Sequence, residues 1–196
     1  MDTADILFLI LLIGVLVGGY AWHRRRLLTA GRNWKKIARR YGGTFKSDGG
    51  GWIVEPNYVV TCEVDGVEVT LDYDVTSTGS STSYRTRVTT ACPVDVQFDI
   101  YREGMLEKVD KALGRQDVRI GDDEYDRVFM IKSDDAKRVR EVCNVTVRAR
   151  HLESPGVRIQ AADGVLKLIQ SGVVFEMKSS VRMLEFAALV SARLQA

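Results

Sequence analysis

The feature that most constrains this chain is an uncharged apolar stretch near its N-terminus, ILFLILLIGVLVGGYAW, which begins at Ile6 and ends at Trp22. Its 17 residues reach the lower length limit for a helix that crosses the hydrocarbon core of a bilayer. Eleven of them are Ile, Leu, Val or Phe. At about −0.3 to −0.6 kcal/mol each, these side chains contribute about −3 to −7 kcal/mol to membrane insertion. We therefore predict that the stretch is a membrane-spanning helix.

A signal peptide and a buried core helix both fit the stretch less well. A cleaved signal peptide has positive charge before the apolar run and a small-residue cleavage site after it. Here the preceding residues include Asp2 and Asp5, and three arginines stand where cleavage would occur. A buried core helix is rarely apolar on every face when it lies at a chain terminus. The stretch is therefore interpreted as a membrane anchor.

The charges that flank the anchor predict its orientation. Arg24, Arg25 and Arg26 follow it directly, and positively charged flanks stay on the cytoplasmic side. We therefore expect a single-pass protein of the cell inner membrane with a cytoplasmic C-terminal domain. Gly14 and Gly18 form a GxxxG pattern, which lets two membrane helices pack closely. This pattern allows, but does not require, a homodimer through the transmembrane helix.

Basic residues are concentrated just after the anchor. Eight of the 28 Lys and Arg residues lie between positions 24 and 40, with no acidic residue among them. They are Arg24, Arg25, Arg26, Arg32, Lys35, Lys36, Arg39 and Arg40. Positions 41–196 hold 20 basic and 24 acidic residues, a net charge of −4. Nucleic-acid-binding domains carry their basic patch on the folded body, so no nucleic-acid partner is expected.

The basic segment, residues 23–41, is predicted to be an amphipathic helix that ends at a glycine pair. Trp34, Ile37, Ala38 and Tyr41 recur at the spacing of one helical face. The cations would be attracted to anionic lipids of the inner leaflet by about 1 kcal/mol per charge. In a second, compatible interpretation, Trp34 and Ile37 pack onto the domain and the cations only enforce topology. The predicted membrane-surface residues are Arg24, Arg25, Arg26, Lys35, Lys36, Arg39 and Arg40.

Residues 42–196 are predicted to form one α+β domain, which follows a tail and membrane helix at 1–22 and the basic segment at 23–41. Apolar and polar side chains alternate in several stretches, as in strands with one buried face. The expected strands are 52–54, 58–64, 67–75, 84–91, 94–101, 118–120, 128–132, 156–161, 165–170 and 173–177. The polar segment 76–83 is expected to be a hairpin loop. The dipeptides Asp65-Gly66 and Asp163-Gly164 predict tight hairpin turns.

Helical periodicity marks residues 103–113 and the C-terminal segment 180–194. The second of these is too apolar to remain exposed, so it should lie across a sheet. The acidic segment 122–126 lacks the spacing and the central glycine of a calcium loop, and is interpreted as a turn with helix-capping carboxylates. The expected fold is a membrane helix followed by one domain of mostly antiparallel sheet with a C-terminal helix packed on it.

One set of residues carries a resemblance to known proteins. The set comprises Gln116-Asp117, Ile120-Gly121-Asp122, Tyr125-Asp126, Phe129, Ile131, Asp163-Gly164 and Phe175-Glu176. It resembles uncharacterised bacterial single-pass membrane-anchored proteins that carry only a domain of unknown function. The resemblance covers roughly residues 84–176 and implies two short helices, at 134–142 and 144–152, but no active site. Residues 145–149 also alternate like a strand; Asn144, a favourable N-cap, supports the helix.

Few side chains suggest a metal or redox centre. Cys62, Cys92 and Cys143 are odd in number and lack CxxC spacing, so we expect reduced, buried thiols. His23 and His151 are the only histidines, which leaves too few ligands for a zinc site. No metal or other cofactor is therefore expected.

Three classes of function follow from these observations. The first is a non-enzymatic, membrane-tethered cytoplasmic domain that binds a protein partner or organises an assembly, because the sequence shows no triad, metal set or phosphate loop. The second is a module that binds lipid headgroups or a small ligand. An apolar cavity, or exposure of Trp52, Tyr58 and Tyr84 beside the basic segment, would favour it.

The third class is a hydrolase or transferase that uses carboxylates as acid and base. The candidates are Asp117, Asp122 and Asp126. A buried carboxylate cluster with perturbed titration in a cleft would favour this class. We expect an enzyme less than a binding domain, and no catalytic residue is assigned.

Overall fold

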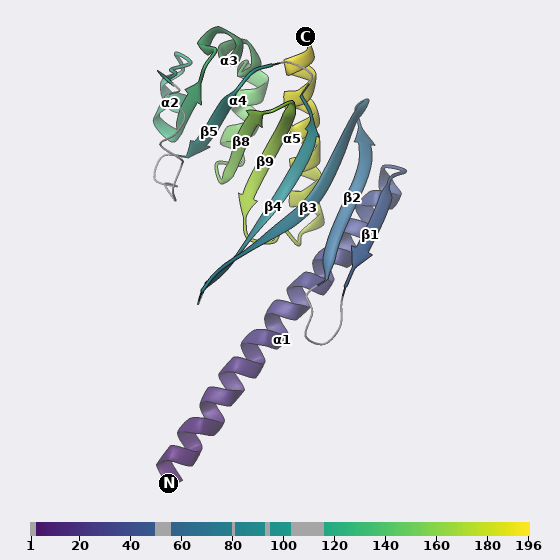
Figure 1. Cartoon of the computed structure of the whole chain (residues 1–196), viewed down its shortest axis with the longest axis vertical. Coiled ribbons are helices and arrows are strands. Elements are labelled where there is room, and N and C mark those ends of the chain that lie inside the picture. The colour runs from purple at the N-terminus through teal and green to yellow at the C-terminus, as the bar shows by residue number, and fades with distance from the viewer. Residues whose placement is uncertain (1–2, 50–55, 80, 93–94, 103–115) are drawn as a thin grey trace.

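The computed structural model describes residues 3–49, 56–79, 81–92, 95–102 and 116–196, and Figure 1 shows their arrangement. A single long helix projects from a domain in which a sheet is packed against helices. The strand predicted at 52–54 and the helix predicted at 103–113 lie outside the described residues.

The first element, α1 (Thr3–Arg40), is one uninterrupted helix of 38 residues that joins the predicted anchor to the predicted basic segment. Its N-terminal part has a window of mean hydropathy 2.3 in which no residue is buried, as expected of a membrane anchor. Its C-terminal part packs on the domain. The buried residues there are Leu27, Ala30, Gly31, Trp34, Ile37 and Ala38. Trp34 and Ile37 therefore pack on the domain, as in the second interpretation of the basic segment.

Within the described residues, nine antiparallel strands form one sheet in the order β1-β2-β3-β4-β9-β8-β5-β7-β6. Their bounds are β1 Thr44–Asp48, β2 Asn57–Val64, β3 Val67–Thr78, β4 Ser81–Ala91, β5 Phe98–Arg102, β6 Gln116–Asp117, β7 Phe129–Ser133, β8 Val157–Ala162 and β9 Val165–Ser171. Asp65 and Asp163 have positive φ and are each followed by a positive-φ glycine, as the predicted hairpin turns require. The predicted α+β class with a mostly antiparallel sheet is confirmed.

The other helices are α2 (Asp123–Val128), α3 (Ala136–Val142), α4 (Val145–Leu152) and α5 (Met177–Gln195). The two short helices implied near residues 134–152 are present. The Asn144 side chain caps α4 by accepting a hydrogen bond of 3.0 Å from the Val147 N–H. The C-terminal helix α5 is confirmed and begins three residues earlier than expected.

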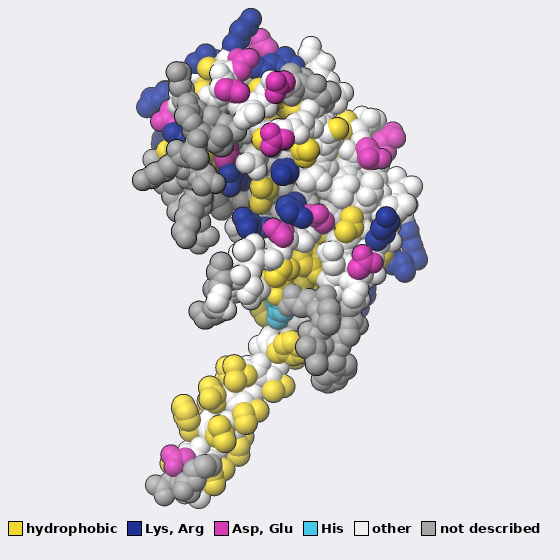
Figure 2. Space-filling view, in the orientation of Figure 1, with side chains coloured by type: hydrophobic (Ala, Val, Ile, Leu, Met, Phe, Trp, Pro, Cys, Tyr) yellow, Lys and Arg dark blue, Asp and Glu magenta, His cyan; other side chains and the backbone are white. Residues whose placement is uncertain are grey.

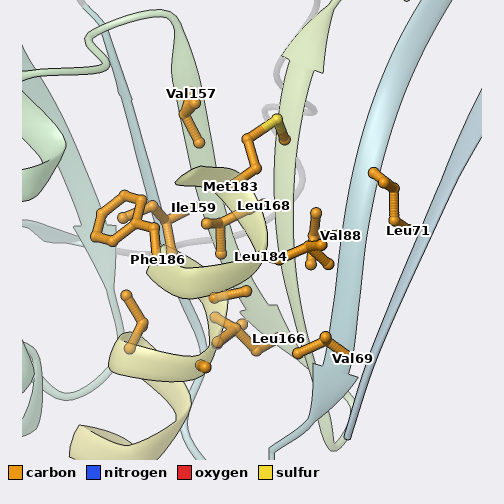
Figure 3. Packing of buried hydrophobic residues seen from close by; sticks show 14 of the residues in the cluster. Val69, Leu71, Val88, Val157, Ile159, Leu166, Leu168, Met183, Leu184 and Phe186 are labelled. Carbon is orange, nitrogen blue, oxygen red and sulfur yellow. The ribbon is translucent and has the colours of Figure 1, made fainter. Parts of the chain in front are cut away.

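The core lies between one face of the sheet and the helices α1 and α5. In Figure 3, side chains from four strands converge on α5. They are Val69 and Leu71 of β3, Val88 of β4, Val157 and Ile159 of β8, and Leu166 and Leu168 of β9, which meet Met183, Leu184 and Phe186. These residues are almost completely buried. Burial of this apolar area is the main favourable term in folding.

The opposite sheet face, here called the outer sheet face, is polar and carries ion pairs. Arg87 of β4 donates to both oxygens of Asp72 on β3, at 2.8 and 3.0 Å. Arg158 of β8 makes a two-point pair with Asp99 of β5, whose side chain is only 5% exposed. Figure 2 shows basic and acidic side chains interleaved on the face in view. An antiparallel sheet can keep one face in water, and this sheet does so.

Some predicted strand boundaries are wrong. Residues 76–78 and 81–83 are not a loop, because β3 and β4 remain paired through Thr76↔Ser83, Ser77↔Thr82 and Thr78↔Ser81. Hydroxyl side chains fit the wet faces of a strand as well as they fit a loop, so composition misled the prediction. The strand expected at 94–101 begins only at Phe98, and the pairing expected at 118–120 occurs at 116–117.

The packing of α1 on the sheet can be tested at Gly31. A methyl group there would lie 2.4 Å from the Tyr58 ring carbon Cζ. Alanine is favoured over glycine in a helix by about 1 kcal/mol, but overpacking typically costs about 1–3 kcal/mol. We expect Gly31→Ala to lower the free energy of unfolding of the full-length protein in detergent by up to about 2 kcal/mol, as measured by urea denaturation and circular dichroism.

Gly19→Ala is the matched control, because a methyl group there has no heavy atom within 4 Å. It should leave the free energy of unfolding unchanged or slightly raised. Equal effects of the two substitutions would contradict the packing of α1 against β2.

Candidate functional site

The connection between β9 and α5 is held by a buried threonine on β4. The Gly172 carbonyl accepts hydrogen bonds from the Thr86 N–H and hydroxyl, at 3.1 and 2.8 Å. The Val174 N–H donates to the same hydroxyl at 2.8 Å, and the Gly172 N–H donates to the Tyr84 carbonyl at 2.7 Å. Thr86 is fully buried, so these bonds are shielded from water.

Side chains of α1 hold the other end of this connection. Trp34 Nε1 donates to the Val174 carbonyl at 3.1 Å, and Asn33 Nδ2 donates to the Phe175 carbonyl at 2.8 Å. The strand predicted at 173–177 is therefore wrong. The carbonyls of Val174 and Phe175 accept hydrogen bonds from side chains of α1 and not from a neighbouring strand. The last residue of the predicted strand, Met177, is the first residue of α5.

These elements enclose a cavity of about 350 Å³ where α1 leaves the domain, here called the juxtamembrane cleft. Its defining residues are His23 and Arg26 of α1, Tyr84 of β4, Gln170 of β9, and Phe175 and Glu176 of the connection. A second hollow, of about 410 Å³, lies beside it and is lined by Trp22, Arg25, Arg26, Thr29 and Phe175. Figure 1 shows that the β3–β4 hairpin extends toward the side of the domain from which α1 projects.

Arg26 is the central cation of the cleft. Its guanidinium carbon lies 4.6 Å from the centroid of the Trp22 ring and 4.3 Å from that of Phe175. Among the described residues, no carboxylate forms an ion pair with it. Nearby, His23 Nε2 and the Tyr84 hydroxyl are hydrogen-bonded at 3.1 Å. Cation–π contacts of this kind hold a guanidinium in place without neutralising its charge.

The predicted membrane-surface residues separate into two groups along α1. With a rise of about 1.5 Å per residue, Arg26 stands about 6 Å beyond Trp22 along the helix axis. On the same basis, Lys35 stands about 20 Å and Arg40 about 27 Å beyond it. Charges are screened over about 8 Å at physiological ionic strength. Lipid contact by the four distal cations therefore depends on helix tilt and stays a prediction.

The aromatic residues whose exposure would favour a module that binds lipid headgroups or a small ligand lie in different environments. Tyr58 is buried in the contact between β2 and α1 and has only 6% of its surface exposed. Tyr84 is half-buried and lines the juxtamembrane cleft. Trp52 lies outside the described residues. The sequence did not predict that Phe175 and Glu176 line a cleft. The available signal for the site was the spacing of Trp22 and Arg26, which lie one helical turn apart in the sequence.

The carboxylates considered for catalysis stabilise local structure. Asp122 caps α2 by accepting from the Tyr125 N–H at 3.2 Å, and it pairs with Arg148 at 2.8 Å. The hydrogen bond from Tyr125 and then the contact with Arg148 lower the pKa of Asp122. The carboxylate of Asp126 accepts from two backbone N–H groups of the preceding turn, both at 2.9 Å. Asp117 is exposed and pairs with Lys132.

These three carboxylates are engaged separately, so they do not form the buried cluster that an acid–base enzyme would need. Among the described residues, no three His, Cys, Asp or Glu side chains are placed to hold a metal ion. Cys62, Cys92 and Cys143 are buried, and none of the three forms a disulfide. Burial raises the pKa of Cys143 to about 12, which disfavours the reactive thiolate.

His151 is buried in the domain and forms part of a structural network. Its Nε2–H donates to the Val157 carbonyl at 2.7 Å, and its Nδ1 accepts from the Tyr125 hydroxyl at 2.7 Å. The Phe129 ring stacks on the imidazole with a centroid distance of 3.8 Å. Desolvation lowers the pKa of His151 to about 4, so the imidazole is neutral at neutral pH.

Comparisons with known proteins give a likeness at the level of the fold. No protein-family model and no curated protein matches the chain. Among solved structures, it is similar to the crystal structure of the mycobacterial trehalose monomycolate transport factor A, TtfA. The TM-score is 0.57 and the sequence identity 13%, over 85% of this chain and 94% of TtfA. These results are consistent with a resemblance to uncharacterised membrane-anchored proteins.

The low pKa of His151 predicts how stability depends on pH. The unfolded state takes up a proton near pH 6.5 and the folded state only near pH 4, so stability is complete above pH 6.5 and falls as pH decreases toward 4. Over this range the free energy of unfolding of the full-length protein should fall by about 3 kcal/mol on account of His151. Urea denaturation at a series of pH values measures the slope of the free energy of unfolding against pH.

The variant His151→Asn should be less stable at pH 7 but should lose this contribution to the slope. His23→Gln, which replaces the other histidine, should retain it. A slope that is the same in the wild type and in His151→Asn would contradict the role assigned to the buried imidazole.

Proposed function

We propose that this chain is a non-catalytic, membrane-anchored domain at the cytoplasmic face of a bacterial inner membrane, where it holds a protein partner in a fixed position. The observation that carries the proposal is the continuity of α1. The helix that is apolar enough to cross a bilayer is also a core element of the domain. A change of domain orientation relative to the anchor would therefore require a break in a packed helix.

The outer sheet face is the surface we assign to the partner. It spans several strands and is not covered by any of the described helices, which pack on the other side. Several of its charged residues are held by ion pairs such as Arg87–Asp72 and Arg158–Asp99. A partner that meets preorganised charges orders fewer side chains on binding, which favours specific association.

The likeness to TtfA suggests the cellular process in which this domain acts. That protein is, by name, a factor in the transport of trehalose monomycolate. The shared fold covers almost all of TtfA and includes most of this chain. We therefore propose that the present chain also serves a transport assembly at the membrane as an accessory subunit. Homodimerisation through Gly14 and Gly18 remains part of the proposal.

A second function, binding of a lipid headgroup or a small ligand, is favoured by one observation. The juxtamembrane cleft lies within about one helical turn of the end of the membrane span. This function is compatible with the first, because the cleft and the outer sheet face are formed by different residues. A carboxylate-based hydrolase has no comparable support.

The orientation of the chain can be tested with reporters fused after Ala196. The arginines that follow the membrane span should retain the domain in the cytoplasm. A reporter that is active only in the cytoplasm should therefore give signal, and a reporter that requires the periplasm should give none. The opposite pair of results would overturn the proposed location.

Partner binding can be tested by photo-crosslinking in intact cells. Benzoylphenylalanine replaces Gln160 or Lys167, which are cross-strand neighbours on the outer sheet face. We expect each position to give one discrete crosslinked product in the membrane fraction, because the anchor fixes the face toward its partner. The product should be identified by mass spectrometry.

Glu124 of α2 and Arg193 of α5 serve as matched control positions, since both are exposed away from the outer sheet face. They should give no such product. Products at all four positions, or at the controls alone, would exclude the outer sheet face as the partner surface.

A further inference from the structure

The juxtamembrane cleft contains two opposite charges that do not neutralise each other. The Arg26 guanidinium lies over the rings of Trp22 and Phe175, and Glu176 lines the same cavity. Within the described part of the chain, Arg26 and Glu176 form no ion pair, and the Glu176 carboxylate accepts a hydrogen bond from the Ser179 hydroxyl at 3.3 Å. The cleft therefore presents a cation and an anion, each available to a ligand.

The geometry of Arg26 suits an oxyanion. Its contacts with the two rings hold the guanidinium in place, and its planar fork of N–H donors can bind an oxyanion. A planar guanidinium held in this way binds phosphate oxygens at two points. The paired His23 and Tyr84 side chains form another wall of the cleft and add polar atoms beside this position.

The height of the cleft identifies the source of such an oxyanion. Arg26 stands about 6 Å beyond the end of the membrane span, and the headgroup layer occupies about 5–7 Å on each side of the hydrocarbon core. The adjoining hollow between Trp22 and Phe175 is mainly apolar and shares Arg26 with the cleft. A lipid whose headgroup enters the cleft can therefore place its glycerol region against these rings.

We infer that the juxtamembrane cleft binds the phosphoethanolamine headgroup of a membrane lipid, with the phosphate on Arg26 and the ammonium group at Glu176. This inference rests on the proposed membrane anchoring but not on the proposed partner surface. A phosphoglycerol headgroup would leave Glu176 unpaired beside an anion. A phosphocholine headgroup has no N–H to donate to the carboxylate. Both should bind less well.

The test uses the full-length protein in nanodiscs that contain equal amounts of phosphatidylethanolamine, phosphatidylglycerol and phosphatidylcholine. Native mass spectrometry after release from the nanodisc counts the lipids that the protein retains. We expect phosphatidylethanolamine to be retained about tenfold more than either other lipid, a factor that one charge-assisted hydrogen bond can supply.

Two variants test the roles of the two charged side chains separately. Arg26→Gln should abolish retention of phosphatidylethanolamine. Glu176→Gln should remove the preference for phosphatidylethanolamine and increase retention of phosphatidylglycerol. Glu176 is exposed, so its substitution should not affect folding, which circular dichroism verifies for both variants. Lys178→Gln removes an exposed cation outside the cleft and should behave like the wild type.

Three results would overturn the inference: equal retention of all three lipids, a preference for phosphatidylglycerol, or a preference that persists in Arg26→Gln. Free O-phosphoethanolamine is added in a parallel arm. If it displaces the lipid at millimolar concentration, the ligand is a soluble phosphate ester and the assignment to a lipid fails. Photo-crosslinking at Gln160 and Lys167 is independent of these outcomes, so each proposal can fail alone.

Discussion

The structure depends on the position of Trp34, a residue of the membrane helix that is completely buried in the domain. Its indole N–H donates to the Val174 carbonyl and to the Ser180 hydroxyl, both at 3.1 Å. Its ring contacts the rings of Tyr58 and Tyr73, which belong to the sheet, in edge-to-face geometry. One side chain therefore joins the anchor, the sheet and the start of α5. These buried contacts fix the C-terminal part of α1 on the domain.

This arrangement also creates the juxtamembrane cleft. The connection 172–176 has no strand partner among the described residues beyond the bridge at Gly172. Its shape is set by hydrogen bonds with Asn33, Trp34 and Thr86. Those bonds place Phe175 against Arg26, immediately above the membrane span. The same contacts that join the domain to α1 thus form a charged cavity about one helical turn from the apolar part of that helix.

The two faces of the sheet have different roles. One face is covered by α1 and α5 and supplies the core. The other is polar and carries ion pairs, of which Asp99–Arg158 is the most buried. Removal of one partner from a buried pair costs about 3–5 kcal/mol, because the other charge is left without compensation. The pairs therefore give the outer sheet face a fixed charge pattern, as a binding surface needs.

The sequence by itself determined the elements that depend on local interactions. Apolar content marks the anchor, Asp65-Gly66 and Asp163-Gly164 mark hairpins, and Asn144 marks the start of α4. Only the tertiary structure decided that α1 continues into the core, that residues 173–176 are not a strand, and which side chains line the cleft. The reason is distance along the chain. The bond from Trp34 to Val174 spans 140 residues, and no local pattern at either residue records its partner.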